Sequence, residues 1–131
     1  MSLSDQFCVD RHKPHFLDLV KNKLDITFAN EQEIMSLIDA KDFKDVVDFG
    51  KNLKKLMVIT RGEKGAISIN GDEIIENGIE ENLNIKDLTG AGDLFAAGFL
   101  HGYLKNLSNL ENLNKGREMS SKVIQQIGAR L

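Results

Sequence analysis

Continuous apolar runs alternate with amphipathic stretches in the first half of the chain. Residues 25–29 and 56–60 are mostly apolar without a break, which is typical of strands in a parallel sheet covered on both faces. Apolar residues at helical spacing predict helices around these strands. The helices are expected at residues 16–20, 31–38 and 45–53, and residues 7–9 are expected to end an earlier strand. This alternation of strand and helix predicts an α/β fold.

The second half predicts a hairpin followed by two long helices. Residues 66–69 alternate apolar and polar positions toward the pair Asn70-Gly71, a strong turn signal, and Ile74-Ile75 follows. The last two helices are expected to end near residues 105 and 128, and the final one to begin near residue 114. We therefore predict a three-layer α/β sandwich with a largely parallel central sheet, whose ligands gather at the carboxyl ends of the strands.

The composition predicts one globular domain over residues 1–131. Hydrophobic residues make up 41% and charged residues 28%, a balance that argues against disorder. The formal net charge of −3 favours neither nucleic acid nor an anionic membrane, so any phosphate site must be local. The single Cys8 is expected to be a small core residue. With no apolar run of membrane-spanning length and no signal-peptide pattern at the start, we expect a cytoplasmic protein without membrane contact.

The segment Gly90-Ala91-Gly92-Asp93, followed by an apolar helix, carries the strongest chemical signal. A glycine turn that opens a helix leaves backbone N–H groups unpaired at the positive end of the helix dipole, where they bind an anion. Asp93 adds a carboxylate that can accept a proton, which suits phosphoryl transfer to a hydroxyl group. The alternative is structural, because small residues such as Gly98 and Gly102 also serve close helix packing.

Several segments, in family order, resemble the carboxyl-terminal half of the ribokinase-like carbohydrate kinases of the phosphofructokinase-B type. Gly90-Ala91-Gly92-Asp93 resembles the family's carboxyl-terminal signature. Asn30-Glu31-Gln32-Glu33 resembles its Asn-x-x-Glu element, and residues 60–65 resemble its nucleotide loop. Residues 123–130 resemble the closing helix that flanks the nucleotide, and residues 4–12 resemble the adenosine-kinase-like branch.

The resemblance implies an ATP-dependent phosphotransferase that acts on an alcohol group of a sugar or nucleoside. It implies that Asp93 takes the proton from the acceptor hydroxyl, while the amides of Gly90, Ala91 and Gly92 form the anion hole. Glu33 would help to hold the water shell of Mg²⁺ on the nucleotide. The remaining site residues are Asn30, Thr60, Gly62 and Gly65, expected to line the nucleotide, and Asp87 and Thr89, which match a monovalent-cation site, for K⁺, in some family members.

Family members are longer, and their sugar-binding strands and lid lie upstream of the matched segments. We therefore expect a nucleotide half-site whose acceptor half is absent. The alternative function is a non-catalytic nucleotide-binding fragment or one half of a split kinase, which would form a homo-oligomer or pair with a separate amino-terminal half. Two structural interpretations also stay open, because Asn30 and Glu33 fit an ordinary capping box and residues 60–65 fit a plain turn.

Overall fold

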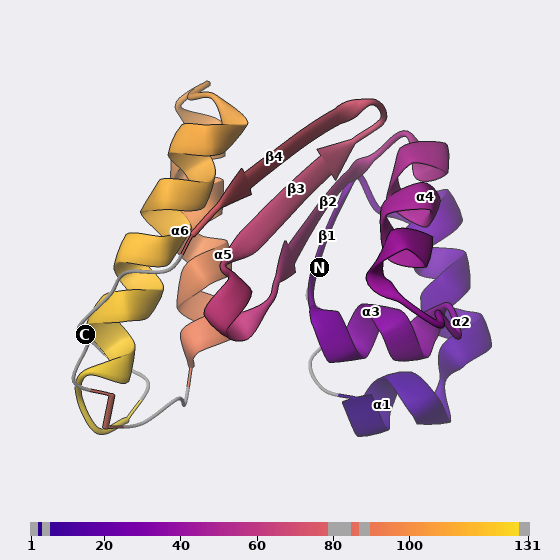
Figure 1. Cartoon of the computed structure of the whole chain (residues 1–131), viewed down its shortest axis with the longest axis horizontal. Coiled ribbons are helices and arrows are strands. Elements are labelled where there is room, and N and C mark those ends of the chain that lie inside the picture. Colours follow the sequence, from indigo (N-terminus) through magenta and orange to yellow (C-terminus); the bar gives the residue numbers. More distant parts are fainter. Residues whose placement is uncertain (1–2, 4–5, 79–84, 87–89, 129–131) are drawn as a thin grey trace. The chain divides into compact units, whose positions relative to one another are not determined.

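The computed structural model describes residues 3, 6–78, 85–86 and 90–128. The chain forms two compact units. Unit 1 comprises Met1–Arg61 and Ile67–Ile74, and unit 2 comprises Gly62–Ala66 and Ile75–Leu131. Unit 1 contains most of the sheet and the shorter helices, whereas unit 2 contains two long helices (Figure 1).

The sheet has the strand order β1-β2-β3-β4. Its strands are β1 (Ile26–Asn30), β2 (Leu56–Thr60), β3 (Ala66–Asn70) and β4 (Glu73–Asn77). β1 and β2 are parallel and their interiors are buried, which explains why the sequence is apolar there without alternation. A short turn containing η2 (Gly62–Lys64) leads back into β3, so the sheet is mixed (Figure 1). The predicted α/β class and the hairpin between β3 and β4 are confirmed, with Gly71 at φ +61° in the turn.

Two helices pack on the sheet of unit 1. α3 (Glu31–Leu37) contacts β1, β2 and α4 (Phe43–Leu53). α4 approaches β3 closely at Gly50, where a Cβ would lie 2.9 Å from the Ile69 side chain. The buried core is aliphatic and consists of Leu3, Val9, Val20, Ala29, Ile34, Leu37, Val46, Met57, Ile59, Ile67 and Ile69.

The start of the chain differs from the sequence prediction. Residues 7–9 belong to α1 (Gln6–Arg11) and do not end a strand. Val9 is fully buried, whereas Phe7 and Cys8 are exposed, so Cys8 is not the core residue that the sequence suggested. A short apolar run does not distinguish a strand from one turn of an amphipathic helix. The chain continues through α2 (Lys13–Asp18) and the π-helical turn η1 (Leu19–Lys23) before it enters the sheet.

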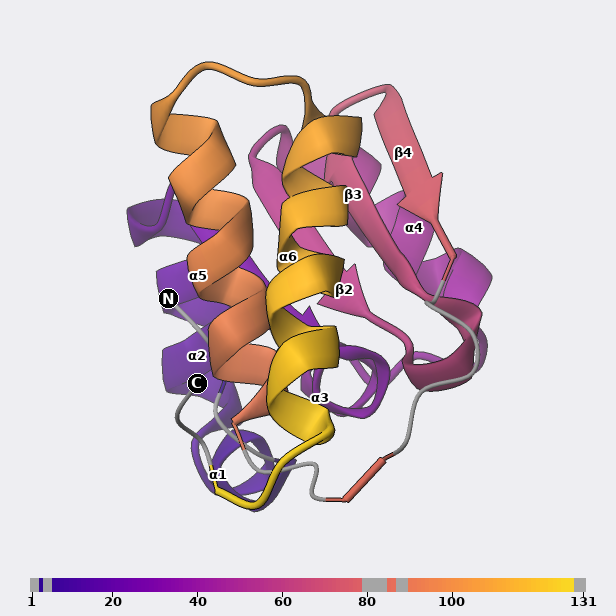
Figure 2. The ribbon, with the colours of Figure 1, turned by 90° about the vertical axis from the view of Figure 1, so that its left-hand side faces the viewer.

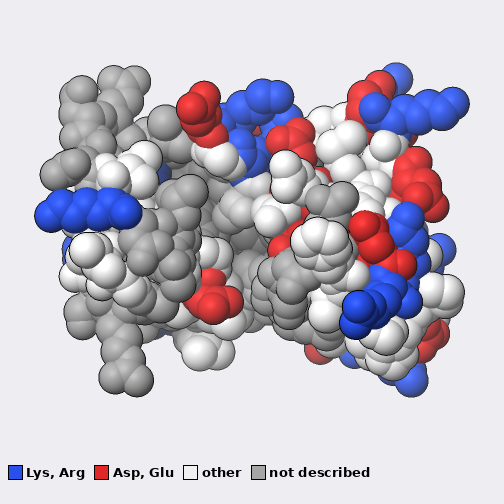
Figure 3. Space-filling model, turned by 90° about the horizontal axis from the view of Figure 1, so that it is seen from below, with Lys and Arg blue, Asp and Glu red and all other residues white. Residues whose placement is uncertain are grey.

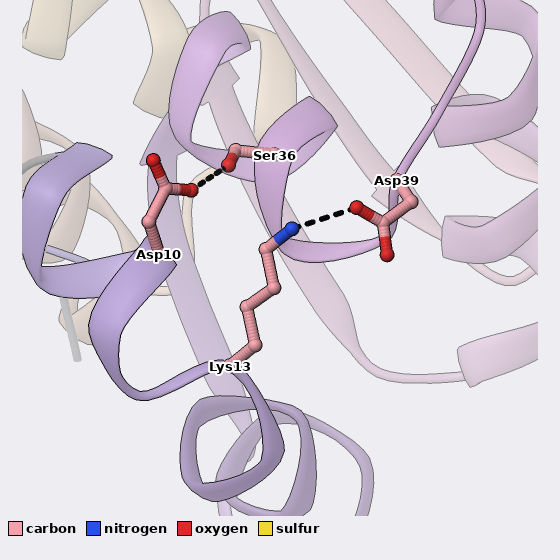
Figure 4. Close-up of polar contacts among 4 residues, drawn as sticks. All are labelled: Asp10, Lys13, Ser36 and Asp39. Atoms are coloured by element: carbon pink, nitrogen blue, oxygen red, sulfur yellow. Dashed lines mark hydrogen bonds and ion pairs between the residues drawn. The ribbon is translucent and has the colours of Figure 1, made fainter.

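Two polar contacts connect the first helices to α3 and the turn that follows it (Figure 4). The Ser36 hydroxyl of α3 donates a hydrogen bond to the Asp10 carboxylate of α1. The Lys13 ammonium of α2 lies 2.6 Å from Asp39 Oδ1, just beyond α3. Both contacts are exposed, so they add little to stability beyond the apolar packing beneath them.

Unit 2 is built around α5 (Ala91–Leu104) and α6 (Asn109–Ile124), which lie side by side (Figures 1 and 2). α5 follows the prediction closely. α6 begins at Asn109, earlier than the expected Asn114, because Ser108 caps it. The expected start followed the apolar stripe of the helix and overlooked the capping signal of Ser108 and Glu111.

Glycines allow α5 and α6 to approach each other. A Cβ at Gly98 would lie 2.5 Å from the Lys115 carbonyl oxygen, and one at Gly102 would overlap Asn112 Oδ1. From the other helix, a Cβ at Gly116 would lie 2.8 Å from the Phe95 carbonyl oxygen. Ordinary side chains do not fit at such distances, so the crossing of the two helices depends on these glycines.

Matching capping boxes begin α3 and α6. At α3, the Glu33 N–H donates to Asn30 Oδ1 at 2.8 Å and the Asn30 N–H donates to Glu33 Oε2 at 2.9 Å. At α6, Ser108 and Glu111 exchange the equivalent bonds at 3.2 and 3.1 Å. Each box satisfies two backbone donors that the helix itself leaves unpaired.

Replacing Gly98 by alanine should lower the free energy of unfolding by about 1–3 kcal/mol, because the new methyl group has to displace backbone atoms of α6. Urea denaturation of the chain measures the loss. Gly78→Ala is the control, since a Cβ there meets no atom of the described part of the chain within 4 Å. Equal stability of Gly98→Ala and the parent chain would contradict the close crossing described above.

Removing the cap of α3 with Asn30→Ala should lower the free energy of unfolding by about 0.5–2 kcal/mol. Asn30→Ser should retain most of that stability, because serine caps a helix about as well as asparagine. Ser108→Ala in the matching box of α6 provides the reference loss in the same thermal or urea unfolding experiment. A loss in Ser108→Ala without one in Asn30→Ala would mean that the bonds at α3 contribute nothing to folding.

Candidate functional site

The carboxyl ends of the two parallel strands bring two predicted site residues together. Asn30 and Thr60 are the last residues of β1 and β2 and are direct partners in the register. Asn30 is exposed and Thr60 is half-buried, so both lie at the accessible edge of the sheet. This edge is where α/β sheets bind their ligands.

Glu33 lies on the first turn of α3, directly beyond this edge. Glu33 is only 5% exposed, and its Oε2 accepts a hydrogen bond from the Asn30 backbone N–H. Asn30 and Glu33 therefore form the capping box that the sequence allowed. A cap holds the Asn30 amide and the Glu33 carboxylate in fixed positions, which also serves a site that needs them fixed.

A cluster beside the strand ends was not expected from the sequence. Arg61 follows Thr60 directly, and its Nη2 lies 3.3 Å from Oε1 of Glu31. The guanidinium carbon of Arg61 lies 3.6 Å from the centroid of the Phe43 ring at the start of α4. The sequence carries no periodic or motif signal that links these three positions.

The loop after β2 contains the predicted residues Gly62 and Gly65. Gly62 has φ +56°, is exposed and has open space around its Cβ position. Gly65 has φ +88°, and a Cβ there would overlap the Asn77 carbonyl oxygen of β4. Both positions therefore require glycine for backbone reasons. At Gly62 the described part of the loop also leaves room for a ligand. At Gly65 the close approach of β4 is enough to explain why the residue is glycine.

The start of α5 differs from the starts of α3, α4 and α6. Gly90 is the N-cap with φ +79° and makes no side-chain hydrogen bond to the helix. The first helical bond runs from the Leu94 N–H to the Gly90 carbonyl at 3.0 Å. The N–H groups of Ala91, Gly92 and Asp93 therefore have no partner within the helix. α3, α4 and α6 are capped by an Asn, Asp or Ser side chain, whereas α5 has no side-chain cap on its first turn, the arrangement that suits anion binding at a helix start.

Gly92 separates the two explanations of the small residues in α5. Among the residues that the structure describes, none lies within 4 Å of a Cβ built at Gly92, and Gly92 is exposed. Close packing therefore explains Gly98 and Gly102 but not Gly92. Asp93 is exposed in the first turn of α5.

The predicted residues fall into two groups. Asn30, Glu33 and Thr60 belong to unit 1, and the glycine loop and the start of α5 belong to unit 2. Asp87 and Thr89 lie outside the described residues.

Charge on the described surface is mixed. Figure 3 shows Lys and Arg side chains interspersed with Asp and Glu over the face of unit 1 that it draws, at the right. No three His, Cys, Asp or Glu side chains come together as metal ligands among the residues that the structure describes. Within that same part of the chain, no helix has both the length and the apolar character needed to cross a bilayer.

Known proteins resemble this chain over most of its length. A cytidine kinase from Thermococcus kodakarensis is 36% identical over 112 residues, which are 83% of this chain and 40% of the kinase. The crystal structure of a probable sugar kinase from Rhizobium etli CFN 42 matches with a TM-score of 0.95 and 42% identity, over 99% of this chain and 40% of that one. The crystal structure of adenosine kinase from Sinorhizobium meliloti matches with a TM-score of 0.95 and 39% identity, over 100% and 40%.

The chain thus spans about 40% of the length of these relatives. The likeness confirms the ribokinase-like α/β fold that the sequence predicted. The model of the pfkB family carbohydrate kinases matches residues 2–131, which is nearly the whole sequence. The chain belongs to the pfkB family of carbohydrate kinases.

Proposed function

We propose that the chain contributes the nucleotide and phosphoryl-transfer half of an ATP-dependent kinase that phosphorylates an alcohol group of a sugar or nucleoside. The observation that carries the proposal is the start of α5. It has no side-chain cap, its first turn carries Asp93, and it contains Gly92, which neither packing against the described residues nor backbone conformation requires. Close approach of a phosphate to the backbone does explain that glycine.

In the proposed reaction the acceptor hydroxyl oxygen attacks the γ-phosphorus of ATP and ADP leaves. The hydroxyl proton passes to the carboxylate of Asp93. The amides at the start of α5, from Gly90 to Gly92, donate hydrogen bonds to the transferring phosphoryl group and stabilise the charge on its oxygens. Because the transition state of phosphoryl transfer is loose, orientation matters more than base strength, and a carboxylate at a helix start is adequate.

We assign the nucleotide contacts to Asn30, Thr60, Gly62 and Gly65. The exposure of Asn30 and Gly62 supports this assignment, because both can meet a ligand without rearrangement. Gly65 shapes the loop through its own backbone conformation.

Mg²⁺, when bound to the nucleotide, neutralises phosphate charge during the transfer. Mg²⁺ can be held through its waters by few protein ligands, and a carboxylate is the hard oxygen group that accepts hydrogen bonds from such waters. The buried, hydrogen-bonded Glu33 would accept hydrogen bonds from those waters. We also keep the assignment of Asp87 and Thr89 to a monovalent cation, K⁺, as a proposal from family resemblance.

The acceptor is proposed to be a sugar or a nucleoside because the relatives include a probable sugar kinase, an adenosine kinase and a cytidine kinase. We place the reaction in the cytoplasm, where ATP is abundant and the exposed thiol of Cys8 stays reduced.

The direct test combines ATP titration with turnover assays on ribose, fructose, adenosine and cytidine. Binding and turnover support the kinase. Binding without turnover assigns the chain the non-catalytic nucleotide-binding role, and size-exclusion chromatography then shows whether copies associate. No ATP binding up to millimolar concentration, with Mg²⁺ present, overturns the proposal.

Gly92→Ala should weaken ATP binding about tenfold, because a methyl group at the amides displaces a phosphate and loses about one charge-assisted hydrogen bond. Stability should stay the same or rise, because alanine is the better helix former and its Cβ meets none of the described residues within 4 Å. Isothermal titration and urea unfolding on the same sample measure both effects. An unchanged dissociation constant would remove the anion hole from the start of α5.

Asp93→Asn should lower kcat/KM by at least about a hundredfold, the usual contribution of a general base. The dissociation constant for ATP should stay within a few fold, since the amides remain in place. Initial rates with the best acceptor in the panel provide the readout, and Asp72→Asn on the β3–β4 turn is the control for removal of a surface carboxylate. Substantial turnover by Asp93→Asn would mean that another group accepts the proton.

A further inference from the structure

We propose that Arg61 is a positioning residue for the nucleotide site, clamping the start of α3 to the end of β2 through Glu31. The inference rests on the proposed function, because Asn30, Glu33 and Thr60 are the site residues that the clamp would hold. All of these residues belong to unit 1.

The ion pair of the clamp forms between the residues that directly follow the last backbone-paired residues of β1 and β2. Asn30 and Thr60 form the last pair of β1 and β2. Glu31 directly follows β1 and Arg61 directly follows β2, and their side chains form an ion pair at 3.3 Å. This side-chain contact joins the two segments at the point where they leave the sheet, since β1 leads into α3 and β2 leads into the loop at Gly62.

The guanidinium group is fixed from two directions. Its Nη2 donates to Oε1 of Glu31, and its carbon lies 3.6 Å from the centroid of the Phe43 ring, which gives a cation–π contact. The side chains of Arg61 and Glu31 are 17% and 26% exposed. The pair is therefore screened less by water and salt than a surface pair is.

These contacts argue for positioning rather than for direct phosphate binding. The positive charge of Arg61 is already matched by the Glu31 carboxylate, and one ring face covers the guanidinium. Glu31 is the first residue of α3, between the N-cap Asn30 and the capping partner Glu33. Holding Glu31 in place therefore holds both ends of the capping box.

Arginine suits this role better than lysine does. Its planar group can bond a carboxylate at the edge while it stacks on a ring, whereas an ammonium is a point charge on a flexible stem. Arg61→Lys should therefore retain the ion pair but lose the stacking. Its effects in the two experiments below should lie between those of the parent chain and of Arg61→Ala. Glu31→Gln removes the charge of the partner with little change in shape. It replaces Arg61→Ala in the same experiments if Arg61→Ala folds poorly.

The first experiment needs no nucleotide. Amide hydrogen exchange, followed by NMR, reports the opening of the Asn30 and Glu33 N–H groups that form the capping box. In Arg61→Ala both amides should exchange about tenfold faster, the size expected from one partly buried ion pair and one cation–π contact. The amides of Ser108 and Glu111 in the matching box are the internal control and should not change. Unchanged exchange at Asn30 and Glu33 overturns the clamp.

The second experiment measures the gain in ATP affinity that Mg²⁺ provides, as the ratio of dissociation constants without and with the ion. Glu33→Gln should reduce this gain, and Arg61→Ala should reduce it by a similar factor. The double variant Arg61→Ala/Glu33→Gln should be no worse than Glu33→Gln alone, because both changes act through one carboxylate. Val20→Ala, a core truncation in η1, is the control for loss of stability and should keep the gain.

Each outcome separates the clamp from the kinase proposal. Independent, multiplied losses in the double variant, or an equal loss in Val20→Ala, would reduce Arg61 to a structural role. Failure of the parent chain to bind ATP overturns the proposed function, and the exchange experiment alone then decides the clamp.

Discussion

The parallel pairing of β1 with β2 is the constraint on which the architecture of unit 1 depends. Parallel neighbours need a crossover connection, and the chain supplies it with α3 and α4. The same pairing brings two strand ends to one edge in register, so Asn30 and Thr60 become neighbours although 29 residues separate them. Helix packing on the sheet buries the strand interiors, and the polar residues remain at the exit where a ligand can reach them.

What could be predicted follows from how local each signal is. β1 and β2 are continuous apolar runs, and the turn at Gly71 has strong local chemistry, so these elements were found within a residue or two. α1 was mistaken for a strand end because one buried residue, Val9, does not define a period. The contact of Arg61 with Glu31 and Phe43 joins three separate segments, and no local pattern in the sequence encodes it.

The glycines of α5 illustrate the same limit for the candidate site. In the sequence, Gly92, Gly98 and Gly102 all fit either a ligand or a helix neighbour. In the structure Gly98 and Gly102 face α6, whereas a Cβ at Gly92 would meet none of the described residues within 4 Å. Only the distances to the partner helix separate a residue kept small by packing from one that packing leaves unexplained, and the sequence does not contain those distances.

The proposed anion site is made of backbone amides, which suits an acidic chain. With a net charge of −3, a phosphate site built from lysines would have to hold several flexible cations against their own conformational entropy. Amides at a helix start are already oriented by the helix, and no counter-charge has to be removed from water to use them. Arg61, the residue directly after β2, is paired with Glu31. The charge of Arg61 thus serves to hold the start of α3 within unit 1, and in the proposed function phosphate binding is assigned to backbone amides of unit 2.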